Sequence, residues 1–350
     1  MNQHRLFEED LDSYLAPYAG ANLIVNESIM PLYRSGESGE LTIRLMDGIK
    51  RIVSVRTATL DKTFTEGRDY LVKDGRLVIP EGSEIRIMPW SEYNPTEGQF
   101  DCVNGGKLIF GEANTMHTRQ YAVTYEPSDD IFAAKYFPTA APELARSRAI
   151  LGKREFRLAF YGDSITYGCN ASGLYAGVPP YMPVYPVLTA EKLRSEGYAV
   201  DYYNPSIGGM DARWGKANAG RYFADHSPDL TVIAFGMNDG TGKVPVDDFI
   251  ERIKAIVGTI RKINPDAEFI LVATTLPNPL SRFVGLQEEY EEPLCELAKS
   301  EGCALLNMTE LHRTLLTRKD YWHMTGNNIN HPSDFLARLY AQGVLALLGE

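Results

Sequence analysis

The sequence has few cysteines and no long apolar run. Its 350 residues include only four cysteines, and none of them has the C-x-x-C spacing of a zinc or redox site: Cys102, Cys169, Cys295 and Cys303. This pattern favours reduced, packed thiols over a disulfide framework or a metal centre. No apolar stretch approaches the roughly 18 residues that a membrane-spanning helix needs. We therefore expect a folded chain without a membrane partner.

Positively charged residues are outnumbered by negatively charged ones. The chain carries 35 lysines and arginines against 46 aspartates and glutamates, for a formal net charge of -11. Such a surface repels phosphate backbones, so nucleic acid is not an expected partner. The opening segment MNQHRLFEEDLDSYLAPY lacks the basic start and the apolar stretch of a secretory signal. If Met1 is the native start, we expect the protein in the cytoplasm. A chain whose signal peptide had been removed would look the same.

Two familiar catalytic signatures are missing. GTGKV at 240–244 ends in valine where a P-loop has Ser or Thr, and it lacks the first glycine of that motif. GDSIT at 162–166 has Thr166 where the G-x-S-x-G turn of α/β-hydrolases has glycine. The sequence thus excludes a P-loop phosphate site and counts against an ordinary α/β-hydrolase.

The first part of the chain has the pattern of an antiparallel β domain. Short alternating segments between 41 and 126 indicate half-buried strands: LTIRLM, IVSVRTATL, DYLVK, RLVIP, EIRIMPW and RQYAVTYE. Asp74-Gly75 predicts a hairpin between two of them. One hydrophobic core usually stops growing below this chain length, so a second domain is expected. We predict that residues 1–150 form an N-terminal β-sandwich accessory domain without catalytic residues, with a linker at 127–154.

Residues 151–350 have a different pattern, in which buried strands alternate with helices. RLAFYGDS, AVDYYNPS, DLTVIAFG, EFILVATT and ALLNM are continuous apolar runs typical of parallel strands with both faces covered. Helical spacing predicts helices at Val187–Gly197, Val246–Asn264, Gln287–Ser300 and Pro332–Leu348. This order predicts an open, doubly wound sheet, whose sites lie at the carboxyl ends of the strands.

Four polar blocks lie at these ends or before the last helix. Ser164 follows the first strand in GDSIT, Gly209 follows the second in NPSIGGMD, and Asn238 follows the third in GMND. His331 precedes the last helix in NHP. A serine can act as nucleophile, a histidine as its base, and Gly N–H and Asn amide groups as donors to an oxyanion. Taken singly, each block is as well explained by a helix cap, a turn or a structural histidine.

In this order, the four blocks resemble those of the SGNH (GDSL) hydrolase family, and the resemblance covers about residues 156–350. It implies a three-layer α/β/α sandwich around a five-stranded parallel sheet, here preceded by the β-sandwich. It also implies a carboxylic ester hydrolase with Ser164 as nucleophile and His331 as base. The backbone N–H groups of Ser164 and Gly209 and the side chain of Asn238 would form the oxyanion hole. The resemblance implies neither a metal nor an organic cofactor.

The sequence departs from the family at one position. Many members have Asp three residues before the histidine, whereas this chain has Asn328. Two explanations stay open: a Ser-His dyad in which a backbone carbonyl orients His331, or a displaced triad in which Asp334 supplies the acid. His323 is the nearest rival base, but stacking beside Trp322 is its expected role.

The substrate is indicated only indirectly. Trp214 follows the glycine block and Trp322 precedes the histidine block, so both are candidates for stacking on a sugar ring, with core packing as the alternative. Together with the β-sandwich, they favour removal of O-acetyl groups from an acetylated oligosaccharide or glycoside. Two alternatives are a short-chain lipid esterase or thioesterase, and a non-catalytic carbohydrate-binding protein on a hydrolase fold. The oligomeric state is not indicated.

Overall fold

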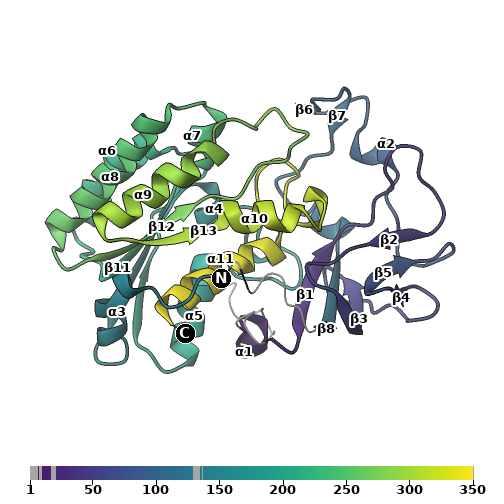
Figure 1. Ribbon diagram of the computed structural model, residues 1–350, viewed down its shortest axis with the longest axis horizontal. Coiled ribbons are helices and arrows are strands. Elements are labelled where there is room, and N and C mark those ends of the chain that lie inside the picture. Colours follow the sequence, from purple (N-terminus) through teal and green to yellow (C-terminus); the bar gives the residue numbers. More distant parts are fainter. Residues whose placement is uncertain (1–6, 8–9, 17–20, 129–134, 136, 350) are drawn as a thin grey trace.

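The larger part of the molecule is built on a five-stranded parallel sheet (Figure 1). The computed structural model describes residues 7, 10–16, 21–128, 135 and 137–349. The strand order is β10-β9-β11-β12-β13, and every neighbouring pair is parallel. The strands are β9 (Phe156–Gly162), β10 (Val200–Tyr203), β11 (Leu230–Ala234), β12 (Glu268–Ala273) and β13 (Ala304–Asn307). This arrangement confirms the predicted fold class.

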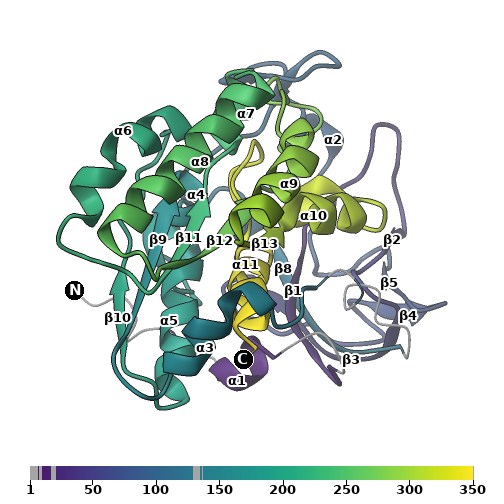
Figure 2. The same cartoon turned by 60° about the vertical axis from the view of Figure 1, so that its left-hand side comes forward.

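Helices cover both faces of this sheet, which gives three layers. On one face lie α6 (Ala212–Phe223), α8 (Val246–Ile263) and α9 (Glu291–Glu301), and on the other lie α5 (Tyr185–Ser195) and α11 (Asp334–Leu348), as Figures 1 and 2 show. Strand side chains alternate between the two faces. Along β9, for example, Tyr161 packs in the cluster with α6 and α8, while Phe160 packs in the cluster with α5 and α11. Because both faces are covered, the inner strands β11 and β12 read as continuous, largely apolar runs.

The predicted helices agree with the structure to within a few residues, although Pro332 lies two residues before α11, whose N-cap is Ser333. Two longer helices were not predicted from the sequence, α6 and α10 (Met308–Leu316). The sequence of α6, ARWGKANAGRYF, is rich in alanine and glycine, so it carries few large apolar residues from which a helical period could be recognised. No helix among the described residues has both the length and the apolar character needed to cross a membrane.

The N-terminal part contains antiparallel sheets, as predicted. One has the order β1-β8-β3 and another the order β2-β5-β4. Their strands are β1 (Ile24–Ile29), β2 (Leu41–Ile43), β3 (Ile49–Thr57), β4 (Leu71–Lys73), β5 (Arg76–Ile79) and β8 (Tyr121–Pro127). The hairpin between β4 and β5 is confirmed. Asp74 and Gly75 have φ of 50° and 68° between the paired residues Lys73 and Arg76, which is the left-handed backbone that a tight hairpin requires.

One predicted strand of this domain is not formed. In EIRIMPW, only Met88 makes a β-bridge, to Leu32, and the segment then enters the short helix α2 (Trp90–Tyr93). Ile85 and Met88 are buried nonetheless. The alternating pattern therefore reflects packing of an extended segment, and Pro89, which has no N–H to donate, ends it. A small third sheet pairs β6 (Phe100–Asp101) with β7 (Lys107–Leu108).

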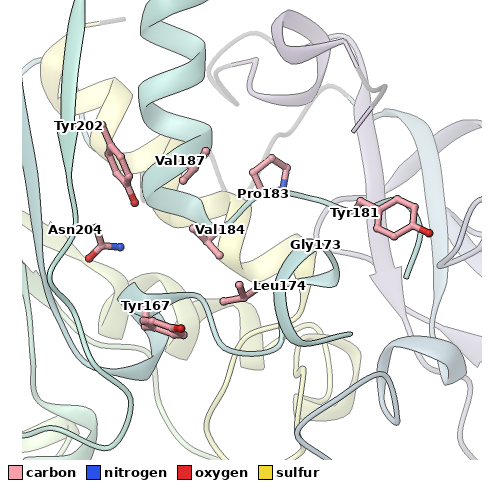
Figure 3. Close-up of a pocket in the computed structure, with 9 residues that line it drawn as sticks. All are labelled: Tyr167, Gly173, Leu174, Tyr181, Pro183, Val184, Val187, Tyr202 and Asn204. Carbon is pink, nitrogen blue, oxygen red and sulfur yellow. The ribbon is translucent and has the colours of Figure 1, made fainter. Parts of the chain in front are cut away.

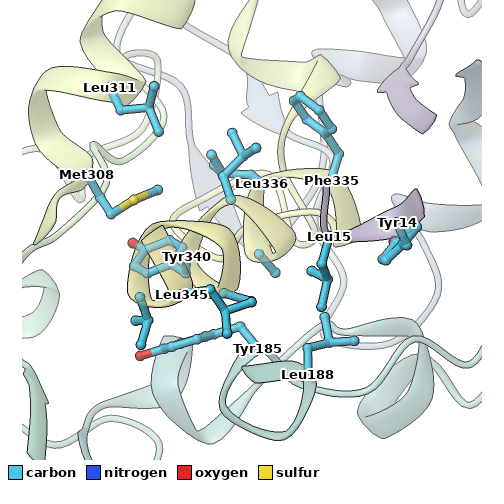
Figure 4. Close-up of a cluster of buried hydrophobic side chains, with 14 of the residues drawn as sticks. Tyr14, Leu15, Tyr185, Leu188, Met308, Leu311, Phe335, Leu336, Tyr340 and Leu345 are labelled. Carbon is cyan, nitrogen blue, oxygen red and sulfur yellow. The ribbon is translucent and has the colours of Figure 1, made fainter. Parts of the chain in front are cut away.

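The two parts share one hydrophobic core. A single cluster joins Val55 and Tyr125 of the β domain to Leu188 of α5 and Leu336 of α11. Figure 4 shows Tyr14 and Leu15, which lie in and directly after α1 (Leu11–Tyr14), beside Phe335 of α11. The N-terminal part is therefore packed against the α/β part through a continuous hydrophobic core.

The second half of the predicted linker is also packed. Residues 129–134 and 136 of that segment lie outside the described residues. The segment further on contains α3 (Ala145–Ile150), and the backbone N–H groups of Arg146 and Ser147 donate to the Glu268 carboxylate at 2.9 and 2.7 Å. These bonds attach the segment to the start of β12.

Candidate active site

Ser164 lies at the carboxyl edge of the central sheet. It is the first residue of the one-turn helix α4 (Ser164–Tyr167), which directly follows β9. Asp163 caps this turn, because its carboxylate accepts the N–H of Ile165 at 3.0 Å. A Cβ atom at Gly162 would lie 2.4 Å from the carbonyl oxygen of Ala234 on β11. Only glycine therefore fits where the chain turns from strand to helix.

Asp163 is buried beside the serine and stands out electrostatically. Burial raises the pKa of its carboxyl to about 7, although the N–H group of Ile165 favours the ionised form. The negative charge of Asp239 also raises it. Asp239 in turn accepts the N–H of Ala212 at 3.0 Å, at the start of α6. Both carboxyls thus hold helix starts around the site.

His331 lies directly against the serine. Its Nε2 atom is 2.9 Å from Ser164 Oγ, and both residues are buried. The loop that carries it is held by Asn327, whose Oδ1 accepts the N–H of His331 at 3.0 Å. The His331 carbonyl accepts from the N–H of Gly326 at 2.8 Å and from Thr325 Oγ1 at 3.1 Å. The ring is thus held in place by its own backbone as well as by its side-chain contacts.

The contacts of His331 Nδ1 differ from both expectations. Asn170 Oδ1 lies 2.6 Å from this nitrogen, and Glu112 Oε2 lies 3.2 Å from it. Asp334 instead accepts the backbone N–H of Ser172 at 2.9 Å through Oδ1, near the start of α11. The nitrogen thus faces two side chains, and neither a backbone carbonyl nor Asp334 takes the place that the sequence analysis considered.

His323, the rival histidine, has a different environment. Its Nδ1 accepts the backbone N–H of Met30 at 2.8 Å, which joins it to the end of β1. Burial lowers the pKa of His323 well below its usual value, and the positive charge of Lys319 lowers it further. An imidazole that is neutral and already bonded in this way serves the packing between the two domains.

The two remaining predicted residues lie next to Ser164. Gly209 has φ of 77°, and the preceding Gly208 would place a Cβ 3.8 Å from Cβ of Ser164. Asn238 is in the short helix α7 (Met237–Thr241), and its Nδ2 donates to the carbonyl of Met210 at 2.9 Å. An amide nitrogen carries two hydrogens, so this bond orients the group and leaves the second hydrogen for a ligand.

These residues surround a cavity of about 520 Å³. It is lined by Phe100, Phe110, Glu112, Ser164, Cys169, Gly208, Gly209, Asn238, Phe283, Asn327, Ile329, Asn330 and His331. Phe100 packs edge-on against Phe110 at 4.6 Å and against Phe283 at 5.2 Å between ring centroids. The cavity therefore combines an aromatic wall with several amide side chains. The four predicted residues Ser164, Gly209, Asn238 and His331 all line it.

The N-terminal domain contributes to this cavity, which the sequence analysis did not predict. Phe100, Phe110 and Glu112 belong to the predicted accessory domain, yet they line the same cavity as Ser164. The sequence analysis also did not identify Asn170 and Asn327 as residues of the site. The only feature of the sequence that indicated a displaced acid was Asn328, which stands where many family members have Asp. No feature of the sequence near Glu112 distinguishes it from the other exposed acidic residues of that domain.

The two candidate stacking tryptophans lie elsewhere. Trp214 on α6 packs against Tyr161 and Tyr222, with ring centroids 5.8 and 5.6 Å apart. Trp322 lies beside Tyr93, at 5.5 Å, and lines a different cavity of about 440 Å³. Neither tryptophan is among the described residues that line the cavity of Ser164. For Trp214, packing against aromatic neighbours matches the alternative considered from the sequence.

A further cavity, of about 270 Å³, lies beside the start of α5 (Figure 3). Its described lining includes Tyr167, Val184, Val187 and Tyr202 but neither Ser164 nor His331. Asn204 at its edge donates from Nδ2 to the carbonyl of Thr166 at 2.9 Å. Of these two cavities, the serine–histidine pair lines the larger one described above.

Comparison with known proteins identifies a family that matches this chain. A sequence model of the GDSL-like Lipase/Acylhydrolase family matches residues 160–338, about half of the chain. No functionally curated protein matches the sequence.

Several solved structures are similar at low identity. The acetyl xylan esterase AlAXEase is 21% identical, covering 54% of this chain and 98% of that chain, with a TM-score of 0.44. A catalytic mutant of Axe2, an acetylxylan esterase from Geobacillus stearothermophilus, is 18% identical over 55% of this chain and 94% of that chain, with a TM-score of 0.46. TesA is 22% identical over 55% of this chain and 97% of that chain, with a TM-score of 0.42.

Proposed function

Because the chain belongs to the GDSL-like lipase/acylhydrolase family, we propose that it is a serine esterase that works through an acyl-enzyme on Ser164. The observation that carries this proposal is the 2.9 Å contact between Ser164 Oγ and His331 Nε2. This contact lies in a cavity large enough for a small substrate. A nucleophile bonded to its base in such a place is the arrangement that acyl transfer needs.

In the first half of the reaction, His331 takes the proton from Ser164 Oγ while the oxygen attacks the ester carbonyl. The carbonyl oxygen becomes negative and is stabilised by the N–H groups of Ser164 and Gly209 and by Nδ2 of Asn238. One such donor is worth about 2.7–4 kcal/mol of barrier. His331 then gives its proton to the departing alcohol. In the second half, His331 activates a water molecule, which releases the acid from Ser164.

We further propose that the acyl group is acetyl and that the alcohol is an oligosaccharide or a glycoside. Phe100, which packs edge-on against Phe110 and Phe283, forms an apolar wall with them, while Asn238 and Asn330 offer amide groups. A sugar ring has both an apolar face and a polar rim, so this combination suits it better than a long acyl chain. The expected cytoplasmic location stays a prediction from the sequence.

The test is hydrolysis of p-nitrophenyl acetate, butyrate and octanoate by the wild-type protein and by Ser164→Ala. We expect turnover that decreases with acyl length and is abolished in the variant, because no other residue replaces the nucleophile. Near wild-type turnover by Ser164→Ala would refute the mechanism. A preference for octanoate would instead favour a lipid esterase or thioesterase. Release of acetate from acetylated xylo-, manno- and pectic oligosaccharides then identifies the sugar.

Covalent labelling by a fluorophosphonate separates an enzyme from a binding protein. A working serine–histidine pair reacts with the probe, and the label is expected on Ser164 alone. A wild-type protein that binds oligosaccharides but neither reacts with the probe nor hydrolyses any ester of the panel would be a carbohydrate-binding protein on a hydrolase fold.

A further inference from the structure

The acidic side chain nearest to the base comes from the other domain. Glu112 lies 3.2 Å from His331 Nδ1 through Oε2, and it lies outside the residues that match the family. Partial burial raises the pKa of Glu112, but the hydrogen bond and charge of His331 lower it by more, so its net shift is downward. The carboxylate is therefore ionised at the pH where a histidine acts as base.

Asparagines of the α/β domain hold the segment that carries Glu112. Nδ2 of Asn170 lies 3.3 Å from the carbonyl of Gly111 and 3.4 Å from that of Ala113. Nδ2 of Asn327 donates to Oε1 of Glu112 at 3.3 Å. These contacts hold Glu112 on both sides of its backbone and at its carboxylate.

Two glycines allow close packing around Glu112. A Cβ atom at Gly111 would lie 2.1 Å from Oγ1 of Thr115. In the loop that carries His331, a Cβ at Gly326 would lie 2.6 Å from Cβ of Asn170. Glycine at both positions therefore lets Asn170 approach the segment 111–113 closely.

Asn170 and Glu112 provide different things to the ring. Because the Asn170 amide nitrogen faces three carbonyl groups, its Oδ1 must face His331 Nδ1, which holds the Nδ1–H tautomer. The amide is neutral, so its charge cannot stabilise the positive imidazolium that forms when Ser164 loses its proton. The Glu112 carboxylate, 3.2 Å from Nδ1, stabilises that positive charge.

We propose that Glu112 is the acid of this site, a positioning residue that acts through His331, so that the N-terminal domain completes the catalytic group. This inference rests on the proposed esterase function. Glu112 stabilises the imidazolium by its charge, and Asn170 sets the orientation of the ring. The domain that carries Glu112 is then part of the enzyme's machinery.

Asn328, which occupies the family's acid position, has a role that fits this arrangement. Its Oδ1 accepts from Tyr93 Oη at 3.0 Å, and its Nδ2 donates to the carbonyl of Ile109 at 3.0 Å. Both partners belong to the N-terminal domain, and Ile109 lies three residues before Glu112. The side chain that would carry the acid in a relative thus holds the segment that carries it here.

The test compares Glu112→Gln, Glu112→Asp and Glu112→Ala with Glu97→Gln, a change at an exposed acidic residue of the same domain. We expect Glu112→Gln to lower kcat for p-nitrophenyl acetate by about 10- to 100-fold with little change in KM. This lies between the small effect of an exposed ion pair and the roughly 10⁴-fold loss of a buried triad acid. Glu112→Asp keeps the charge and should lose less. Glu97→Gln should match the wild type.

Two readouts separate this role from a merely structural one. The rate of fluorophosphonate labelling of Ser164 should fall in Glu112→Gln by a similar factor, because labelling also needs the imidazolium. Added formate should partly restore kcat in Glu112→Ala, since the truncated side chain leaves space for a small carboxylate in the open cavity. A structural defect would not respond to formate.

The inference is overturned if Glu112→Gln retains wild-type kcat and labelling rate, or if its loss is matched by a lower unfolding temperature and formate restores nothing in Glu112→Ala. Failure of the proposed function has a different signature. In that case the wild type itself neither hydrolyses the esters nor reacts with the probe.

Discussion

The ion pair between Glu27 and Lys319 allows a sharp test of how strongly the two domains are joined. Glu27 is on β1, and Lys319 follows α10 in the other domain. The two side chains are in contact, and neither has any exposed surface. Lys319 Nζ also donates to the Ser28 carbonyl at 2.9 Å, and Glu27 accepts from Tyr125 Oη at 2.7 Å. We predict that Lys319→Met destabilises the whole protein.

The magnitude follows from what each change leaves behind. Lys319→Met leaves a buried carboxylate without its counter-charge, which typically costs about 3–5 kcal/mol. Tyr125 and the N–H of Met46 still donate to Glu27, so we expect a loss near the lower end, about 3 kcal/mol. Burial lowers the pKa of Lys319 even though Glu27 opposes the shift, so the pair does not fully offset its desolvation. The double variant Glu27→Gln/Lys319→Met should therefore lose much less than the sum of the single variants.

The assay is calorimetric unfolding of the wild type, both single variants and the double variant. In a chain of this length, a loss of about 3 kcal/mol should lower Tm by roughly 4 °C. Lys73→Met is the matched control. Lys73 and Glu40 both belong to the N-terminal domain and pair at 2.8 Å, and both side chains are about half exposed. This substitution should cost less than about 1 kcal/mol. The reasoning is refuted if Lys319→Met costs no more than this control, or if the single losses simply add.

Three further predictions concern the site. Asn238→Ala should lower kcat for p-nitrophenyl acetate by about 10²–10³-fold with the fold intact, because it removes an oxyanion donor; an unchanged kcat in steady-state assays would exclude Asn238 from the oxyanion hole. Asn328→Asp should not raise kcat, and it should lower Tm, because a buried carboxylate replaces the amide N–H that donates to the Ile109 carbonyl. A gain in kcat would show that an acid at position 328 can support His331. Asp163→Asn tests pH dependence. The folded pKa of about 7 lies above the unfolded value near 3.8, so the folded state binds more protons in between and loses stability as pH rises through this window. Because asparagine cannot ionise, the variant should exceed the wild type in stability at pH 8 by up to roughly 4 kcal/mol, with the difference shrinking at pH 4–5; equal unfolding free energies at both pH values would contradict the raised pKa.

The parts of the site that could be predicted are those fixed by local sequence. Ser164 and Asn238 each follow a buried strand of the sheet, and Gly209 follows the edge strand β10. Parallel strands bring such positions to one edge of the sheet, so their proximity follows from the strand order alone. His331 was recognisable because it precedes an apolar helical segment. The Asp74-Gly75 hairpin was equally local, since a left-handed turn has few acceptable sequences.

The parts that could not be predicted depend on how the two domains dock. Glu112 lies beside His331 where Asn170, Asn327 and Asn328 bind the segment 109–113. Asparagine amides in irregular loops have no periodicity, so the sequence carries no pattern for such contacts. From the sequence alone, where the docking cannot be recognised, the N-terminal strands therefore predict an independent accessory domain.

Burial of aromatic residues was a second source of error. Trp322 precedes the histidine block in sequence, but its ring faces Tyr93 in the cluster between the domains. The short 3-10 turn Tyr321–His323 directs His323 toward β1 and so also fixes the neighbouring indole. Proximity along the chain to a catalytic block therefore did not predict proximity in space.

The shared core has a consequence for the order in which the protein can be made. Ala16 accepts a hydrogen bond from Gln342 Nε2 at 2.8 Å across 326 residues of sequence, and Arg338 lies over the ring of Tyr14 at 4.4 Å. During synthesis, the strands of the N-terminal domain leave the ribosome long before α11, which completes their core. Until then, Tyr14 and the other residues of the shared core lack their native contacts with α11, and contacts of such long range form slowly. Nascent chains stalled before α11 should therefore bind chaperones and resist folding, whereas chains stalled after it should not.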